Sequence, residues 1–147
     1  MFVYQLKSWI KVSVACCLAV GVLLMMRTGN AVQLYKTQGD RTFYLFTPSS
    51  QAVQTSMLDL KTVLFVEGES VCFARPKEEA LEIAKGIVSC YGGEIVCEEE
   101  ACGVRCFYAF VPNLVGGVLV QGKMVNLHIA VSDTQCQVGT PLLFGGF

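Results

Sequence analysis

Residues 76–93, PKEEALEIAKGIVSCYGG, decide the fold because they are typical of one amphipathic helix with both of its ends. Pro76 suits the first helical turn, where its fixed φ fits and its missing N–H is not needed. Most of the residues that follow are good helix formers, and the Gly92-Gly93 pair supplies the left-handed residue that ends a helix. The pattern therefore predicts a helix over residues 77–91 that lies across a sheet. Apolar residues recurring every three or four positions give it one buried stripe, made of Ala80, Ile83, Ala84, Ile87 and Tyr91.

Short apolar runs on both sides of this helix are typical of β-strands, and Gly, Pro, Ser and Asp residues separate them where turns are expected. Consecutive strands that are joined by short turns must be antiparallel. The pattern therefore predicts an α+β domain over residues 42–147, an antiparallel sheet with one main helix on one face. The predicted strands are residues 42–46, 51–60, 63–66 with 69–74, 94–98, 104–111, 118–120, 123–131, 135–138 and 142–144.

Two of the predicted turns depend on charged residues. The strand after residue 63 is expected to be interrupted at Glu67-Gly68, and the hairpin over 94–111 is expected to turn around Glu99-Glu100-Ala101. The acidic run Glu98-Glu99-Glu100 at the tip of this hairpin is typical of a solvated turn, with a cation site as the alternative. The apolar tail, residues 138–147, is expected to form an ordinary sheet strand. The alternative is an edge strand that a partner extends.

The N-terminal residues 12–26, VSVACCLAVGVLLMM, form an uncharged and mostly apolar run between Lys11 and Arg27. A helix of this length spans about 22 Å, against a hydrocarbon core of about 30 Å, and Trp9 lengthens the run if Lys11 reaches the headgroups. Two interpretations of residues 1–31 fit: a signal anchor held in the membrane through residues 12–26, or a signal peptide that is cleaved near Ala31.

Both interpretations place the domain outside the cytoplasm. Lys7 and Lys11 precede the apolar run, which favours an N-terminus on the inner side of the membrane. We therefore expect a single-pass protein of the cell membrane with an extracytoplasmic C-terminal domain, or a secreted domain after cleavage. Residues 32–41 are polar and contain Gly39, and they are expected to form a short stalk.

The charge distribution argues against nucleic acid as a partner. Lys7, Lys11 and Arg27 give the first 31 residues a charge of +3. The remaining residues include eight basic and twelve acidic ones, which leaves this part of the chain with a charge of −4. Nucleic-acid binding needs several cations that neutralise phosphates, so an acidic body is a poor match for it.

The C-terminal part of the domain carries a family resemblance. Residues 123–131, KMVNLHIAV, followed by Val138-Gly139-Thr140-Pro141, resemble the ending of the YwmB-type family, exported proteins of endospore-forming and related bacteria whose function is not established. The resemblance covers residues 77–144, about half of this chain, as a helix followed by strands. It implies a TATA-box-binding-like fold with a helix on a curved sheet. It also implies an envelope location and a connection with sporulation or the cell wall.

Six cysteines occur after residue 31, and three of them are clustered: Cys97, Cys102 and Cys106. If residues 103–110 form a strand, Cys102 and Cys106 are separated by about 13 Å, which is too far for one zinc ion. Cys97 can approach either of them across the hairpin, so a disulfide is one interpretation, beside free structural thiols and a thiol-active site. Cys90 is expected to be a buried, small apolar residue of the helix.

His128 is the only histidine of the chain. Its strand pattern marks no neighbour for acid–base or ligand chemistry, so a structural or surface histidine is expected. The alternative is a pocket on the concave side of the sheet, lined by Tyr44, Tyr108 and His128, that binds a small ligand or a cell-wall fragment.

The sequence contains no G-x-S-x-G motif, no phosphate-binding glycine loop and no Cys–His pair with supporting spacing. We therefore expect no catalytic residues, no metal site and no cofactor. The hypothesis that fits best is a non-enzymatic envelope domain that acts by protein interaction or regulation, with an unknown envelope protein as partner. A binder of a small ligand or cell-wall fragment and a thiol-active protein are the alternatives.

Overall fold

The computed structural model describes residues 2–28, 32–45, 53–59 and 62–143, with side chains in the first helix described only at 9–23 and 25. In chain order, its elements are α1 (Phe2–Thr28), β1 (Asp40–Leu45), β2 (Val53–Thr55), the short 3-10 helix η1 (Val63–Phe65), β3 (Val66–Ala74), α2 (Lys77–Cys90), β4 (Glu94–Ala101), β5 (Val104–Phe110), β6 (Val118–Val120), β7 (Lys123–Val125), β8 (Leu127–Val131) and β9 (Gln135–Thr140).

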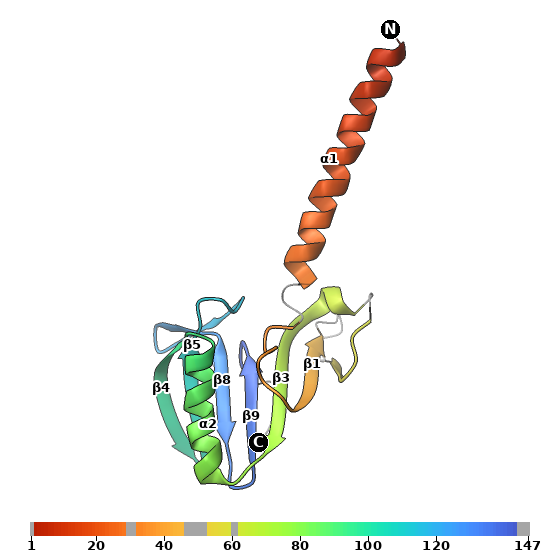
Figure 1. The fold of residues 1–147 in the computed structure, drawn as a ribbon. Helices are drawn as coiled ribbons and strands as arrows, with labels where there is room; N and C mark the ends of the chain where they lie inside the picture. Colours follow the sequence, from red (N-terminus) through yellow and green to blue (C-terminus); the bar gives the residue numbers. More distant parts are fainter. Residues whose placement is uncertain (1, 29–31, 46–52, 60–61, 144–147) are drawn as a thin grey trace.

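The structure confirms an α+β domain with an antiparallel sheet. Seven strands form this sheet in the order β2-β1-β3-β9-β8-β5-β4, and every neighbouring pair is antiparallel. The hairpin β6–β7 forms a separate two-stranded sheet. Helix α2 crosses one face of the large sheet, and α1 projects away from the domain (Figure 1).

The core lies between α2 and the sheet, and the predicted helix is confirmed within one residue of its end. Ala80, Ala84 and Val88 of α2 are buried against apolar side chains of β5, β8 and β9, and Tyr91 closes the cluster at the end of the helix. Burial of each large apolar side chain contributes about 1.5–3 kcal/mol. Ile83 and Ile87 of the predicted stripe are only half-buried, and Cys90, expected to be buried, is exposed.

Two turns differ from the sequence prediction. β3 is one strand from Val66 to Ala74, but its pairing with β1 shifts register at the expected interruption, because Tyr44 is opposite Gly68 and Leu45 is opposite Val66. Residues 63–65 form η1 instead of a strand. The β4–β5 hairpin turns at Cys102-Gly103, and the three glutamates expected at its tip belong to β4. Cys102 and Gly103 both have positive φ, 52° and 81°, as a two-residue type I′ hairpin turn requires.

Of the described residues of the apolar tail, only residues 138–140 form the expected sheet strand, and residues 142 and 143, predicted as strand, lie outside any strand. β9 lies in the middle of the sheet, between β3 and β8. After β9 the chain leaves the sheet, and Leu143 packs against Gly139 on the face opposite α2, where a side chain at 139 would collide with it. Residues 144–147 lie outside the described part of the chain.

The described residues of α1 from Val12 to Met25 carry no charge, and most of them are apolar. From Trp9 to Met25 all described residues are exposed, with only Gly21 half-buried. Its end contacts η1 of the domain. No helix in the described residues combines the length and the apolar character that crossing a membrane requires.

Candidate functional site

Two of the three residues proposed as a ligand face lie together. Tyr108 of β5 and His128 of β8 are directly opposite each other, and their rings stack with centroids 4.5 Å apart and an angle of 15°. Tyr44 is on β1, from which β3 and β9 separate β8, so it lies about 14 Å away at the usual strand spacing. Its buried hydroxyl contacts the Ser70 hydroxyl at 3.1 Å. The structure thus brings Tyr108 and His128 together and leaves Tyr44 apart.

His128 is enclosed by the domain. It is 5% exposed, and the Leu143 backbone N–H donates to its Nδ1 at 3.4 Å. Burial lowers the pKa of His128 from 6.5 to about 4, so the ring is neutral at physiological pH. The Tyr108 hydroxyl donates a hydrogen bond to Glu99 at 3.4 Å. Burial raises the pKa of Tyr108, and the neighbouring Cys106 and Glu99 raise it further. This pair is a packed, uncharged part of the sheet, and ligand binding at it stays a prediction.

The cysteine cluster is spread over the β4–β5 hairpin. Cys97 is opposite Tyr108, Cys106 is opposite Glu99, and Cys102 is at the exposed turn. Cys97 and Cys106 are therefore diagonal neighbours, with Cα atoms about 7–8 Å apart, beyond the usual span of a disulfide. All described cysteines are free thiols.

Two of the described thiols, Cys106 and Cys136, lie in surroundings that disfavour the thiolate. Burial raises the pKa of Cys106 and the Glu99 charge raises it further, while burial raises the pKa of Cys136 to about 12. A raised pKa lowers the fraction of nucleophilic thiolate. Among the residues that the structure describes, no three His, Cys, Asp or Glu side chains are grouped so as to hold a metal ion.

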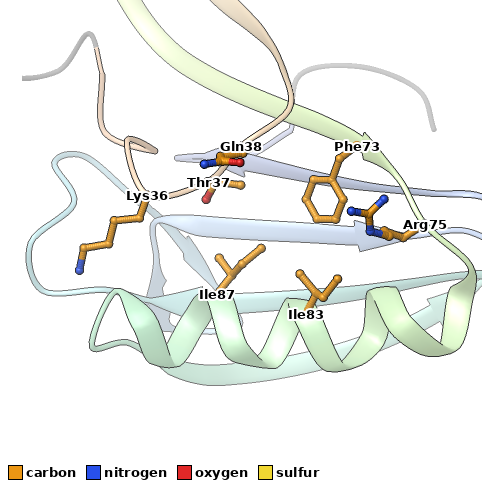
Figure 2. A pocket seen from close by; sticks show the side chains of 7 residues that line it. All are labelled: Lys36, Thr37, Gln38, Phe73, Arg75, Ile83 and Ile87. Atoms are coloured by element: carbon orange, nitrogen blue, oxygen red, sulfur yellow. The ribbon is translucent and has the colours of Figure 1, made fainter.

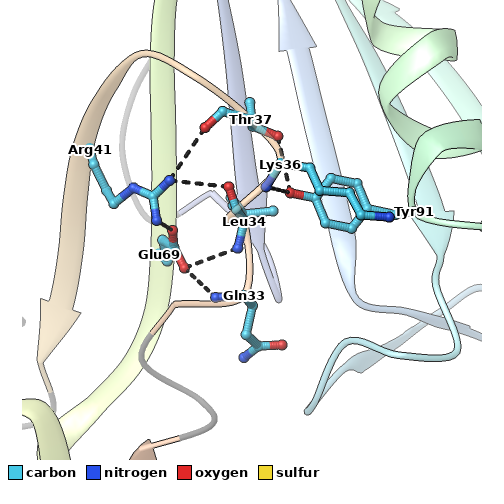
Figure 3. Close-up of polar contacts among 7 residues, drawn as sticks. All are labelled: Gln33, Leu34, Lys36, Thr37, Arg41, Glu69 and Tyr91. Carbon is cyan, nitrogen blue, oxygen red and sulfur yellow. Dashed lines mark hydrogen bonds and ion pairs between the residues drawn. The ribbon is translucent and has the colours of Figure 1, made fainter.

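The segment 33–38, which belongs to the predicted stalk, is instead fixed to the domain (Figure 3). Leu34 is fully buried in the main core, and Thr37 is buried beside it. The Lys36 backbone N–H donates to the Tyr91 hydroxyl at 2.8 Å, which ties the segment to the end of α2. The segment packs on the same face of the sheet as the helix.

A buried carboxylate on β3 holds the start of this segment. The Glu69 side chain is fully buried, and one of its oxygens accepts backbone N–H bonds from Gln33 and Leu34 at 2.7 and 3.2 Å. Its other oxygen lies 2.7 Å from the Arg41 guanidinium. Arg41 also donates to the carbonyl oxygens of Leu34 and Thr37. Burial raises the pKa of Glu69, while the two amides and Arg41 oppose the rise.

A groove lies between this segment and α2, with a cavity of about 270 Å³ (Figure 2). Ile83 and Ile87 point into it from the helix, and Phe73 lies across from them on β3. The segment supplies the other wall. The full lining is Lys36, Thr37, Gln38, Phe73, Arg75, Ile83 and Ile87.

The groove is basic at its ends and apolar in its middle. Lys36 lies at the C-terminal end of α2, where its ammonium donates to the Cys90 carbonyl at 2.8 Å. Arg75 directly precedes the helix and pairs on its solvent side with Glu79 at 3.2 Å. In the part of the chain described, no acidic side chain lines the cavity. This groove is thus a local basic site on a domain whose total charge is acidic.

Sequence reasoning missed the groove because half of it comes from the presumed stalk. One signal was available: Glu69 shares the period-two face of Val71 and Phe73 in β3, so a charged residue stands at a core-facing position. A carboxylate there needs buried hydrogen-bond donors, and Gln33, Leu34 and Arg41 provide them.

Comparison with known proteins identifies no relative of this chain. No protein-family model, no curated protein and no solved structure matches it.

Proposed function

We propose that this chain is a non-enzymatic domain of the bacterial envelope that binds a protein partner in the groove beside α2. One observation carries the proposal: the apolar floor made by Phe73, Ile83 and Ile87 lies between two basic side chains, Lys36 and Arg75. Such a site suits a ligand with an apolar centre and acidic ends, because opposite charges at the rim add register and specificity.

The size of the groove favours a peptide segment as the ligand. A cavity of about 270 Å³ accepts one or two apolar side chains. The two basic residues mark the ends of α2, whose fourteen residues are about 21 Å long. An extended peptide covers that length with about six residues. We therefore propose an acidic peptide segment with central apolar residues, contributed by another envelope protein.

Membrane attachment through α1 is part of the proposal. The helix leaves the domain, and its described residues from Val12 to Met25 are exposed or half-buried, uncharged and mostly apolar, which favours an apolar phase around them. Lys11 and Arg27 frame its apolar run. A YwmB-type kinship, with an extracytoplasmic location and a link to sporulation or the cell envelope, remains our proposal on the basis of residues 77–144.

Site-specific photo-crosslinking tests the proposed binding site. Ile87, which faces the groove, is replaced by the photo-reactive residue p-benzoylphenylalanine, and the full chain is irradiated in the membrane of the cell that produces it. Ser89 provides a matched control, because it is exposed on the same helix and is outside the groove lining. We expect a discrete protein adduct from position 87 and none from position 89.

Mass spectrometry of the adduct then identifies the class of ligand. An acidic peptide segment of an envelope protein is the expected result. Equal adducts from both positions contradict a specific groove partner. An adduct with a non-protein fragment contradicts the proposed class and favours the small-ligand or cell-wall-fragment hypothesis.

A further inference from the structure

Six of the nine exposed large apolar residues in the described part of the domain lie on segments at one end, the end from which α1 emerges (Figure 1). The strand directions place the start of β3, the end of β5 and the start of β8 there. We define the apolar rim as six exposed residues at this end: Tyr35, Phe65, Val115, Val118, Leu119 and Met124.

The opposite end of the sheet has a different surface. It carries the charged residues Arg75, Lys77, Glu100 and Asp133, and three of these form the ion pairs Lys77–Glu100 and Lys77–Asp133. None of the exposed large apolar residues of the described domain belongs to the turns at that end, which are residues 75–76, 102–103 and 132–134. The domain is thus polarised along its strands, with the apolar end toward α1.

The hairpin β6–β7 is the most prominent part of the rim. Leu119 of β6 is opposite Met124 of β7, and Leu119 is 70% exposed. The turn between the strands, Gln121-Gly122, has two positive φ angles and so keeps the hairpin tight. Lys123 is exposed next to Met124, where its cation can meet a phosphate headgroup.

The hairpin is held to the domain by buried polar contacts. Asn126, which follows β7, is 1% exposed and exchanges two hydrogen bonds of 2.8 Å with the Val111 backbone. Its amide also donates to the Leu114 carbonyl at 3.0 Å. The Val115 backbone N–H donates to Gln33 at 2.6 Å, which joins the rim to the segment that follows α1. The rim is therefore presented on a firm support.

We infer that the apolar rim rests on the lipid surface, so that the domain lies against the membrane with the β6–β7 hairpin in the headgroup region. Two features select lipid over a protein partner. The rim lies at the same end of the domain as α1, whose run from Val12 to Met25 carries no charge, and it combines scattered large apolar residues with an adjacent lysine. The inference rests on the proposed attachment through α1.

Single-tryptophan fluorescence of the full chain tests the inference, because Trp9 is the only tryptophan. The reporter variant combines Trp9→Phe with Leu119→Trp, and a second reporter combines Trp9→Phe with Phe65→Trp in case the hairpin variant misfolds. The control combines Trp9→Phe with Thr134→Trp, which places the ring in the exposed β8–β9 turn at the opposite end. Each is reconstituted in phosphatidylcholine–phosphatidylglycerol vesicles with and without bromine on the acyl chains.

We expect both rim reporters to emit at shorter wavelength and to lose about half of their emission in brominated vesicles, while the control loses little. Rim and control reporters that behave alike would overturn the inference. Vesicle flotation then separates the two hypotheses. A chain that still co-floats with the vesicles retains the proposed attachment through α1, whereas a chain that does not co-float contradicts both this attachment and the contact of the rim with lipid. A rim reporter that is shielded from iodide in water but not quenched by brominated lipid indicates a protein contact and also overturns the inference.

Discussion

Glu69 and Arg41 form an ion pair of 2.7 Å in which the carboxylate is fully buried and the guanidinium is about one-quarter exposed. The pair fixes a segment that comes from far away in the chain, because Glu69 also accepts the amides of Gln33 and Leu34. That segment forms one wall of the groove. The ion pair therefore couples the chain directly after α1 to the shape of the candidate binding site.

Glu69→Gln tests this coupling. A neutral amide leaves the Arg41 charge without its counter-charge. It also keeps only one acceptor oxygen, so its NH2 group must face either Arg41 or the two backbone N–H groups. We expect the free energy of unfolding to fall by about 2–4 kcal/mol at pH 7 in urea titrations of the full chain in detergent. Hydrogen exchange at residues 33–38 should become faster. The control is Glu67→Gln, an exposed glutamate of the same strand, and equal effects of the two changes would contradict the coupling.

His128 gives the domain a defined pH dependence. Its folded-state pKa of about 4 lies below the unfolded value of 6.5, so the unfolded chain binds a proton first as the pH falls. Stability is therefore lost between pH 6.5 and about 4, and the total loss is about 3 kcal/mol. His128→Gln removes the only histidine of the chain.

The measurement is the difference in free energy of unfolding between the wild type and His128→Gln, determined at several pH values. We expect the wild type to lose its advantage steadily as the pH falls from 7 to 4. Other titrating groups occur in both proteins and cancel in the difference. A difference that does not change with pH would contradict the buried neutral ring.

The β4–β5 turn predicts opposite effects of two substitutions at one position. Cys102 has φ of 52°, a conformation that suits Asn and strains a β-branched residue. We expect Cys102→Asn to raise the free energy of unfolding by about 0.5–1 kcal/mol and Cys102→Val to lower it by about 1 kcal/mol or more. Thermal unfolding of the two variants, compared under reducing conditions, checks this. A Val variant as stable as the Asn variant would exclude the positive φ.

Gly39, which follows the groove segment, has no room for a side chain. Its φ is 153°, and a Cβ atom would approach the Cys72 carbonyl oxygen to 2.4 Å. We expect Gly39→Ala to destabilise the domain by about 2 kcal/mol and to loosen the segment in hydrogen exchange. Gly86→Ala is the matched control, because Gly86 is inside α2 with open space around it, and there we expect a gain of about 0.5–1 kcal/mol. A neutral Gly39→Ala change would show that the segment can shift at low cost.

Elements with a strong apolar period could be predicted from the sequence. Elements whose bounds depend on tertiary contacts could not. Helix α2 follows from Pro76, its 3.6-residue apolar period and the glycines after it, and the structure ends it at Cys90. Local signals failed at the β4–β5 turn, where three glutamates resemble a loop. As strand residues, Glu99 lies opposite Cys106 and Glu100 opposite Arg105.

The site was harder to predict because it depends on a long-range contact. The polar composition of residues 32–41 predicts a stalk, but Leu34 is fully buried because Glu69, 35 residues later, holds its backbone. Tyr108 and His128 meet because β5 pairs with β8, and Tyr44 stays apart because β9 and β3 come between. The alternation of apolar and polar residues within a strand does not specify which strands are its neighbours in the sheet.

The most direct test of the central claim is photo-crosslinking from position 87 in a chain whose groove charges are reversed by Lys36→Glu and Arg75→Glu. The proposal of an acidic peptide partner predicts that the adduct formed by the unreversed chain is lost, because both ends of the groove then repel the ligand. Circular dichroism and hydrogen exchange of the reversed chain confirm that its fold is intact. An adduct of unchanged yield in a folded, charge-reversed chain would contradict the claim that these two basic residues select the partner.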